Sequence, residues 1–175
     1  RHWHKAGFVQ PEQPRHVGSR GNAPVKKPLV IDCYGHYTTA PKALENWRNR
    51  QIAGIADPAS MPKVSELKIS DDELRESIET NQLRLMRERG SDLTIFSPRA
   101  SFMAHHIGDF QISSTWAAIC NELCHRVSQL FPDHFVGAAM LPQSTGVDPA
   151  TCIPELEKCV TEYGNVGINL NPDPS

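Results

Sequence analysis

The sequence predicts an α/β fold, namely the amino-terminal half of a TIM-type (β/α)8 barrel, about four β/α units, behind a disordered tail. Short apolar runs alternate with stretches of helical periodicity, a pattern typical of a parallel sheet covered by helices. No Gly-x-Gly-x-x-Gly follows any of the runs, which weakens the alternative of a dinucleotide-binding open sheet. Polar residues follow all four runs, and a barrel collects its strand ends at one mouth. The pattern therefore favours the barrel over a doubly wound sheet.

The first part of the pattern contains two expected strands and one expected helix. The first strand covers residues 29–33, and we expect a long loop containing Trp47 after it. A Ser-x-x-Glu capping box at Ser70 predicts a helix that ends at Gly90. The second strand covers residues 93–96. The residues of this helix that are expected to point inward are Leu74, Ile78, Leu85 and Met86.

The second part repeats the alternation. Apolar residues at helical spacing predict a helix near residues 113–131, followed by a strand over residues 135–141. A further helix is expected over residues 151–163, with Pro154 tolerated in its first turn. The fourth strand is expected over residues 166–171.

Composition limits the class of protein. The chain has 175 residues, a formal net charge of -2 and 22% charged residues, so it has no charge excess that indicates nucleic acid or an anionic membrane. No apolar run approaches the roughly 20 residues of a membrane-spanning helix. The five cysteines include no Cys-x-x-Cys pair, which favours a reducing, cytoplasmic setting. Cys120, Cys124 and the adjacent His125 could bind a metal, but their apolar helix stripe favours core packing.

Residues 1–28 differ from the rest and are expected to form an irregular basic tail. Their only acid is Glu12 among six basic residues and four prolines, and such a segment buries too little surface to offset its ordering entropy. A leader, a natural extension and a remnant of cloning all remain open. The segment His2-Trp3-His4 resembles a ligand pair but belongs to this tail. Residues 29–175 are expected to form the barrel domain.

The end of the first strand carries the most informative residues. After an apolar run come Asp32, Cys33, Tyr34, Gly35 and His36, at the position where α/β enzymes place metal and substrate groups. Residues two apart in an extended chain point the same way, so Tyr34 and His36 should share a face. His36 is a good metal ligand, with a hydrogen-bonded structural histidine as the alternative, whereas a neutral phenol is a poor ligand. Asp32 is expected to face inward or to cap the turn.

Candidate substrate groups follow the later strands. Arg99, held by the preceding proline, could grip a carboxylate with two hydrogen bonds, and the alternative is an exposed salt bridge. Asn169 and Asn171 alternate with Leu170, so both amides should face the mouth and orient a polar substrate, unless they serve turn chemistry. Gln143 follows the third strand. The pair His105-His106 is expected to be exposed to solvent.

Five segments together carry a specific family resemblance: IDCYGHYT (31–38), ISDDE (69–73), NQLRL (81–85), TIFSPRA (94–100) and NLNPDP (169–174). They resemble the 4-oxalomesaconate hydratase family of the amidohydrolase superfamily, over essentially all of the chain from Leu29 onward. The resemblance implies a zinc-dependent (β/α)8 barrel that hydrates a tricarboxylic substrate in protocatechuate 4,5-cleavage catabolism. It implies that His36 is a zinc ligand and that Arg99, Asn169 and Asn171 contact substrate.

Two departures from the family pattern limit what carries over. The family has His-Gly-His after its first strand, and this chain has Tyr34-Gly35-His36. The family also continues through strands five to eight, which supply another histidine ligand and a carboxylate, so the acid/base residue is expected outside this chain. The remaining alternatives are a decarboxylase or hydrolase of the same superfamily and a catalytically inactive partial barrel. A homo-oligomer is also compatible with the sequence.

Overall fold

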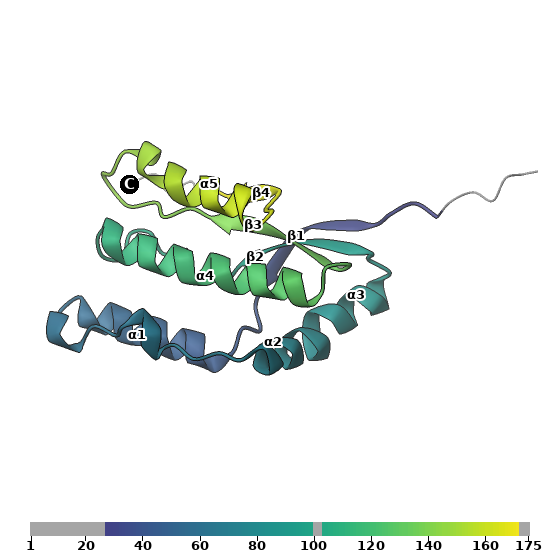
Figure 1. Ribbon diagram of the computed structural model, residues 1–175, viewed down its shortest axis with the longest axis horizontal. Coiled ribbons are helices and arrows are strands. Elements are labelled where there is room, and N and C mark those ends of the chain that lie inside the picture. The colour runs from purple at the N-terminus through teal and green to yellow at the C-terminus, as the bar shows by residue number, and fades with distance from the viewer. Residues whose placement is uncertain (1–26, 100–102, 172–175) are drawn as a thin grey trace, which may run out of the picture.

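The computed structural model describes residues 27–99 and 103–171, and its centre is a four-stranded sheet (Figure 1). The strands are β1 (Ile31–Tyr37), β2 (Leu93–Pro98), β3 (Phe135–Met140) and β4 (Gly167–Asn169). All three pairings are parallel, and the strands follow one another in the order β1-β2-β3-β4. An open doubly wound sheet reverses direction at a switch point, whereas a barrel adds its strands in sequence. The sheet therefore matches the amino-terminal half of a (β/α)8 barrel, as predicted.

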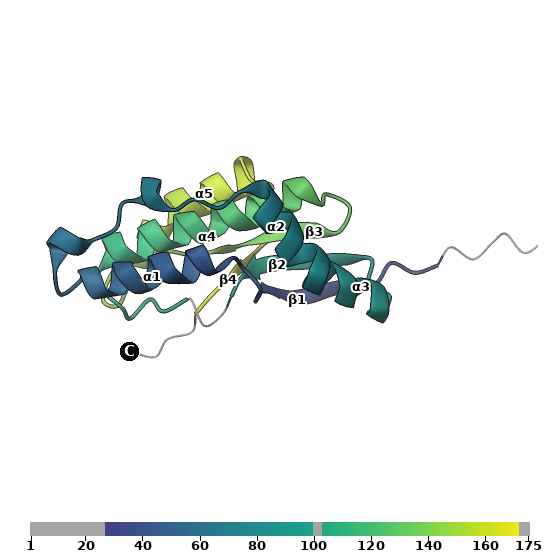
Figure 2. The same cartoon turned by 90° about the horizontal axis from the view of Figure 1, so that it is seen from below.

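Helices connect the strands and cover the sheet; in Figure 2, α2, α4 and α5 lie above the strands. In a barrel this is the outer layer, and the opposite face of the sheet lines the interior. No helix in the described part of the chain is long and apolar enough to cross a membrane. The α-helices are α1 (Lys42–Gly54), α2 (Asp71–Ser77), α3 (Arg84–Arg89), α4 (Phe110–Leu130) and α5 (Ile153–Thr161). The other helical turns are η1 (Pro58–Ser60), η2 (Val64–Glu66), η3 (Ile78–Leu83, a π-helix) and η5 (Pro149–Cys152).

The region around Trp47 is helical, so the prediction of a long loop there is wrong. Helix α1 buries Trp47 against Trp116 of α4, with ring centroids 6.3 Å apart and planes 6° from parallel. Two of its other inward positions hold Arg48 and Gln51, which are 4% and 2% exposed. Polar residues on the inward face blur the apolar stripe by which an amphipathic helix is recognised. The expected tail, with His2 and His4, lies outside the described residues except for its last two positions.

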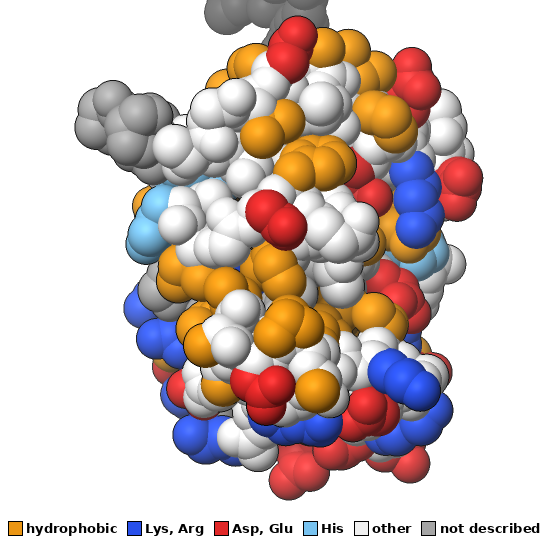
Figure 3. All heavy atoms as spheres, turned by 90° about the vertical axis from the view of Figure 1, so that its left-hand side faces the viewer, with side chains coloured by type: hydrophobic (Ala, Val, Ile, Leu, Met, Phe, Trp, Pro, Cys, Tyr) orange, Lys and Arg blue, Asp and Glu red, His pale blue; other side chains and the backbone are white. Residues whose placement is uncertain are grey.

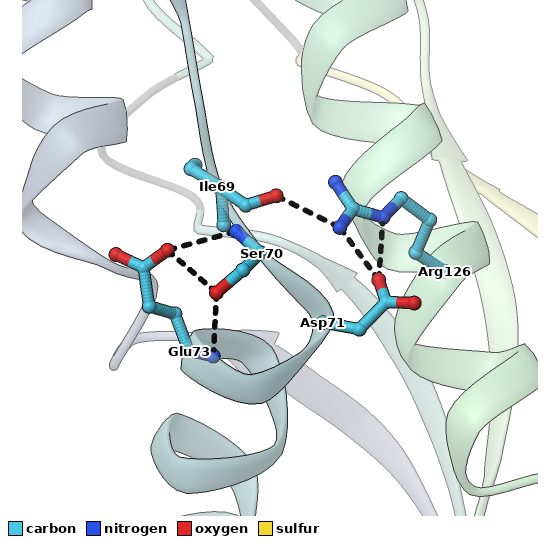
Figure 4. A network of polar contacts seen from close by, with 5 residues as sticks. All are labelled: Ile69, Ser70, Asp71, Glu73 and Arg126. Atoms are coloured by element: carbon cyan, nitrogen blue, oxygen red, sulfur yellow. Dashed lines mark hydrogen bonds and ion pairs between the residues drawn. The ribbon is translucent and has the colours of Figure 1, made fainter.

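The predicted helix from Ser70 to Gly90 has the expected ends but an altered middle. Ser70 Oγ accepts a hydrogen bond from Glu73 N, and Glu73 Oε2 accepts one from Ser70 N at 2.8 Å. Gly90 ends the helix with φ at 71°. Between these ends the π-turn η3 interrupts the α-helical ladder. Figure 4 shows how α4 is joined to the helix start: Arg126 donates to the Asp71 carboxylate and to the carbonyl of Ile69.

Replacing Ser70 with alanine should lower the free energy of unfolding by about 1 kcal/mol, the usual loss for an N-cap. Hydrogen bonds from Ser70 lower the pKa of Glu73. A carboxyl group whose pKa is lowered by folding stabilises the folded state at pH values above its unfolded-state pKa. This contribution is lost as the pH falls through the folded-state pKa. The difference between Ser70→Ala and the parent should therefore shrink in acid. Urea unfolding at several pH values measures it, with the exposed Ser65→Ala as control; equal losses in both variants would contradict the capping role.

The core lies between the helices and the sheet. Phe96 of β2 is fully buried and contacts Tyr37 and Phe135, with ring centroids 5.1 Å and 5.0 Å away. Burial raises the pKa of Tyr37 to about 12, so its hydroxyl stays protonated and donates to Ser77 Oγ, which in turn donates to Leu74 O. Cys120 and Cys124 are also buried in this core, and burial raises the pKa of both thiols. Both are therefore packing residues.

Candidate metal and substrate site

The strands run with their carboxyl ends toward the side of the molecule that faces the viewer in Figure 3, on which apolar and histidine side chains are exposed. Strand β1 reaches this end through a bulge. Asp32 pairs with Thr94 and Gly35 with Phe96, so Cys33 and Tyr34 together lie opposite one residue of β2. Bulges often re-aim a side chain beside a functional site. The Tyr34 and His36 rings still meet edge to face, with centroids 4.6 Å apart, as their spacing predicted.

The His36 ring is held by the neighbouring strand in one tautomer. Nδ1 lies 2.8 Å from Ser97 Oγ and 3.1 Å from Pro98 O. Ser97 Oγ donates its only hydrogen to Gly35 O at 2.9 Å, and the Pro98 carbonyl can only accept. The imidazole hydrogen must therefore lie on Nδ1. Nε2 is left with a bare lone pair, buried and without a partner among the described residues.

This arrangement is the one that a metal-binding histidine requires. Such a ligand donates one ring N–H to a carbonyl or similar acceptor and coordinates through the other nitrogen. The described residues gather no group of three or more His, Cys, Asp or Glu that would complete a metal site. Among the described residues, His36 thus has the geometry of a ligand but lies in no group that would complete a metal site.

Tyr34 and Asp32 do not complete a metal site with His36. Tyr34 is 77% exposed and presents a phenol, which binds divalent metals weakly unless it loses its proton. Asp32 Oδ1 accepts a hydrogen bond from Tyr34 N at 3.0 Å, so the exposed Asp32 caps the bulge, one of the two roles expected for it.

Gln82 supports the His36 segment, a role that sequence analysis missed. Its Oε1 accepts a hydrogen bond from Thr39 Oγ1 at 2.6 Å, and its Nε2 reaches Thr38 Oγ1 and His36 O at 3.4 Å and 3.5 Å. The π-turn η3 carries this residue, and π-turns are frequent at functional sites. The motif NQLRL contained the residue, but nothing local predicted which way it would point.

Asn171 joins three strand exits through its side-chain nitrogen and its backbone. Its Nδ2 donates to Met103 O at 2.9 Å and to His105 Nδ1 at 2.6 Å. Its backbone exchanges two hydrogen bonds with the side chain of Gln143, at 2.8 Å and 3.1 Å. In contrast, Asn169 Nδ2 is buried and has no partner among the described residues. The side-chain nitrogen of Asn169 is therefore a buried hydrogen-bond donor that no described residue uses.

His105 is buried, so the expectation that both histidines of His105-His106 are exposed is wrong for the first of them. His105 is 8% exposed, and only His106 faces solvent. The two histidines lie in a turn, and their ring planes stand 88° apart. Asn171 comes from the fourth β/α unit, and local sequence gives no sign of that contact.

Arg99 is exposed at the exit of β2, directly after the proline whose carbonyl orients His36. It lines a hollow of about 220 Å³ between the exit of β1 and the start of α1. Lys42 and Glu45 line the same hollow and form an ion pair of 3.2 Å with each other. Arg99 therefore stands at the mouth, where it was expected, in a space large enough for part of a small molecule.

Comparison with known proteins supplies the context for this site. The amidohydrolase family model matches residues 31–175. A 2-keto-4-carboxy-3-hexenedioate hydratase from Sphingobium sp. (strain NBRC 103272 / SYK-6) is 56% identical over 146 residues, which cover 83% of this chain and 42% of that protein. The crystal structure of 4-oxalomesaconate hydratase from Rhodopseudomonas palustris superposes with a TM-score of 0.78 at 77% identity, covering 83% of this chain and 42% of that one.

A more distant structure, a dihydroxybenzoic acid decarboxylase from Polaromonas sp. JS666 with bound manganese and the inhibitor 2-nitroresorcinol, has a TM-score of 0.53 at 27% identity. The matched region covers 83% of this chain and 39% of the decarboxylase chain. The chain thus spans less than half the length of each of these relatives. The family match covers most of the sequence and all four β/α units, and the chain therefore belongs to the amidohydrolase family.

Proposed function

We propose that this chain is part of a metal-dependent hydratase, a lyase that adds water to 4-oxalomesaconate or its close tautomers in protocatechuate catabolism. The observation that carries the proposal is the 77% identity to 4-oxalomesaconate hydratase across 83% of the chain. The second hydratase, at 56% identity, acts by its name on a substrate of the same kind. A small tricarboxylic acid in the cytoplasm is accordingly the proposed substrate, with no nucleic acid or membrane partner.

The geometry at the end of β1 supports a metal-dependent reaction. His36 presents a buried, unprotonated Nε2, and its Nδ1–H is held by Ser97 and Pro98. A divalent cation bound there, zinc by family resemblance, supplies Lewis-acid activation of water or of a substrate oxygen. The manganese in the distant decarboxylase supports a divalent cation of this class. Tyr34 stands at the first histidine of the family's His-Gly-His motif, and its neutral phenol is a poorer metal ligand than an imidazole.

The other residues of the mouth have separate roles in the proposal. Arg99 holds one substrate carboxylate by charge-assisted hydrogen bonds. Asn169 donates its unused Nδ2–H to a polar group of the substrate. Asn171, Gln143 and His105 keep the loops of the mouth together through the hydrogen bonds already described. The acid/base group is assigned to the part of the protein that follows this chain.

A substrate assay with the full-length protein tests the function. Incubation with 4-oxalomesaconate should remove the absorbance of the conjugated double bond without releasing carbon dioxide. Carbon dioxide release from an aromatic or unsaturated acid would instead identify a decarboxylase, the alternative within the same family. Absence of both reactions in a folded, metal-loaded protein would contradict the proposal and favour a catalytically inactive barrel.

Replacing Arg99 with alanine should lower kcat/KM of the full-length protein, because a charge-assisted contact to the substrate is lost. The decrease should correspond to about 2 kcal/mol or more of lost transition-state stabilisation. Metal content and melting temperature should stay unchanged, since Arg99 is exposed. Arg87→Ala, an exposed arginine of α3, is the matched control. Steady-state kinetics measure the effect. If Arg99→Ala has the kcat/KM of the parent, Arg99 does not contact the substrate.

A further inference from the structure

Ser97 of β2 lies between the candidate metal ligand and the bulge of β1. It is 3% exposed, so its hydrogen bonds are made inside the protein. Its hydroxyl donates its single hydrogen to Gly35 O at 2.9 Å, and the same oxygen lies 2.8 Å from His36 Nδ1. Since the hydrogen of Ser97 is used, its oxygen accepts the Nδ1–H of His36. The three residues thus form a chain of hydrogen bonds that begins at the imidazole and ends at a backbone carbonyl.

The glycine before His36 lets the two strands come close enough for this chain. A Cβ atom at Gly35 would collide with Thr94 Cγ2 and would lie 2.9 Å from Ile95 O, and both residues belong to β2. The second contact is with the backbone, so a side chain at position 35 would force the strands apart. Glycine inside a strand often marks such a close approach of two backbones. The Ser97 hydroxyl reaches both of its partners because this approach is possible.

The carbonyl of Pro98 is a second acceptor for the same ring hydrogen, at 3.1 Å from His36 Nδ1. Ser97 Oγ is the closer of the two acceptors. Both keep the hydrogen on Nδ1, which leaves the lone pair on Nε2, the buried nitrogen without a partner among the described residues. In metalloproteins, loss of the group that holds a ligand histidine typically weakens metal binding by roughly 10- to 100-fold.

We propose that Ser97 is a positioning residue for the metal, which fixes the tautomer and the rotation of the His36 ring and acts only through that ring. The inference rests on the metal-dependent function proposed above. Both partners of the Ser97 hydroxyl directly follow the bulge of β1, so the hydroxyl also ties the bulge to the ligand. Without it, the ring keeps only the more distant carbonyl of Pro98. Both tautomers should then be populated, and the metal should bind less tightly.

Nitrogen NMR of the full-length, metal-free protein with isotope-labelled histidine tests the tautomer, at a pH at which imidazole is neutral. The ring signals of His36 are assigned by their loss in His36→Gln. In the parent they should report hydrogen on Nδ1, and in Ser97→Ala a mixture of the two tautomers. Hydrogen on Nε2 in the parent would overturn the proposal, and so would an unchanged Nδ1–H form in Ser97→Ala. The result for the parent does not depend on any variant folding.

Competition with a chelator for zinc provides the second measurement on the full-length protein. Zinc should bind about tenfold more weakly to Ser97→Ala than to the parent, and Ser97→Thr, which keeps a hydroxyl, should recover most of the affinity. Ser128→Ala is the matched control and should bind zinc like the parent. Ser128 is 9% exposed, and its hydroxyl donates to His125 O of its own helix.

Equal zinc affinities of Ser97→Ala and the parent would overturn the proposal. An equal loss of affinity in Ser128→Ala would also overturn it, because the loss would then follow from the removal of any buried serine hydroxyl. A parent protein that binds no zinc would instead overturn the proposed metal dependence. The NMR measurement distinguishes these failures, since it tests the hydrogen bond from His36 to Ser97 without metal.

Discussion

Replacing His36 with alanine should remove the metal from the full-length protein and abolish its turnover. His36 is the described residue whose free nitrogen is buried, unprotonated and fixed in orientation by Ser97 and Pro98. Loss of one ligand from a site of about four donors leaves too few to hold a divalent ion tightly. Elemental analysis and the hydratase assay measure the two effects.

His106→Ala is the matched control, since this exposed histidine should affect neither metal content nor turnover. A His36→Ala protein that keeps one tightly bound metal would show that the site lies elsewhere. Circular dichroism and thermal unfolding of the variant should be close to those of the parent, because His36 is only partly buried. Metal loss in a folded protein then reports ligation directly.

Replacing Tyr34 with histidine should have the opposite effect and raise metal affinity and turnover together. The two rings already meet at 4.6 Å between centroids, so an imidazole at position 34 would lie beside that of His36. A neutral phenol must lose a proton to bind well, and an imidazole need not. Competition with a chelator measures the affinity, and Tyr34→Phe is the control. An unchanged affinity in Tyr34→His would mean that the bulge directs residue 34 away from the metal.

Replacing Phe96 with alanine should lower the free energy of unfolding by about 3–5 kcal/mol, the usual range for a large aromatic residue in a core. Phe96 is fully buried and contacts the rings of Tyr37 and Phe135, so its loss leaves a cavity between β1, β2 and β3. Chemical denaturation measures the loss. Ile55→Ala, at a side chain that is 41% exposed, should cost far less. A loss below about 1 kcal/mol for Phe96→Ala would mean that this core does not support the sheet.

The local sequence was sufficient to predict that four strands exist and where the helix from Ser70 to Gly90 begins and ends. The first strand was placed too early: it runs over Ile31–Tyr37, not over residues 29–33, so Tyr34 and His36 lie within it. The hydrophobic periodicity of strands and helices, helix caps and glycines with positive φ each depend on a few neighbouring residues. They can therefore be recognised in the sequence without a structure. The sequential strand order followed from the absence of a nucleotide-binding turn and the polar strand ends. The resemblance to a hydratase family likewise depended on short, contiguous motifs.

The tertiary structure alone decided how those residues are used, because the contacts that decide it join distant segments. The tautomer of His36 depends on Ser97 and Pro98, 61 and 62 residues away. The burial of His105 depends on Asn171, 66 residues away, and the same contact ties the Asn171 amide to the loop after β2. Helix α1 was missed for the same reason, since Arg48 and Gln51 become inward-facing residues only through partners on and near helix α4. Local periodicity records which face of an element is apolar, whereas hydrogen-bond partners and compensated charges are set by the packing of elements far apart in the chain.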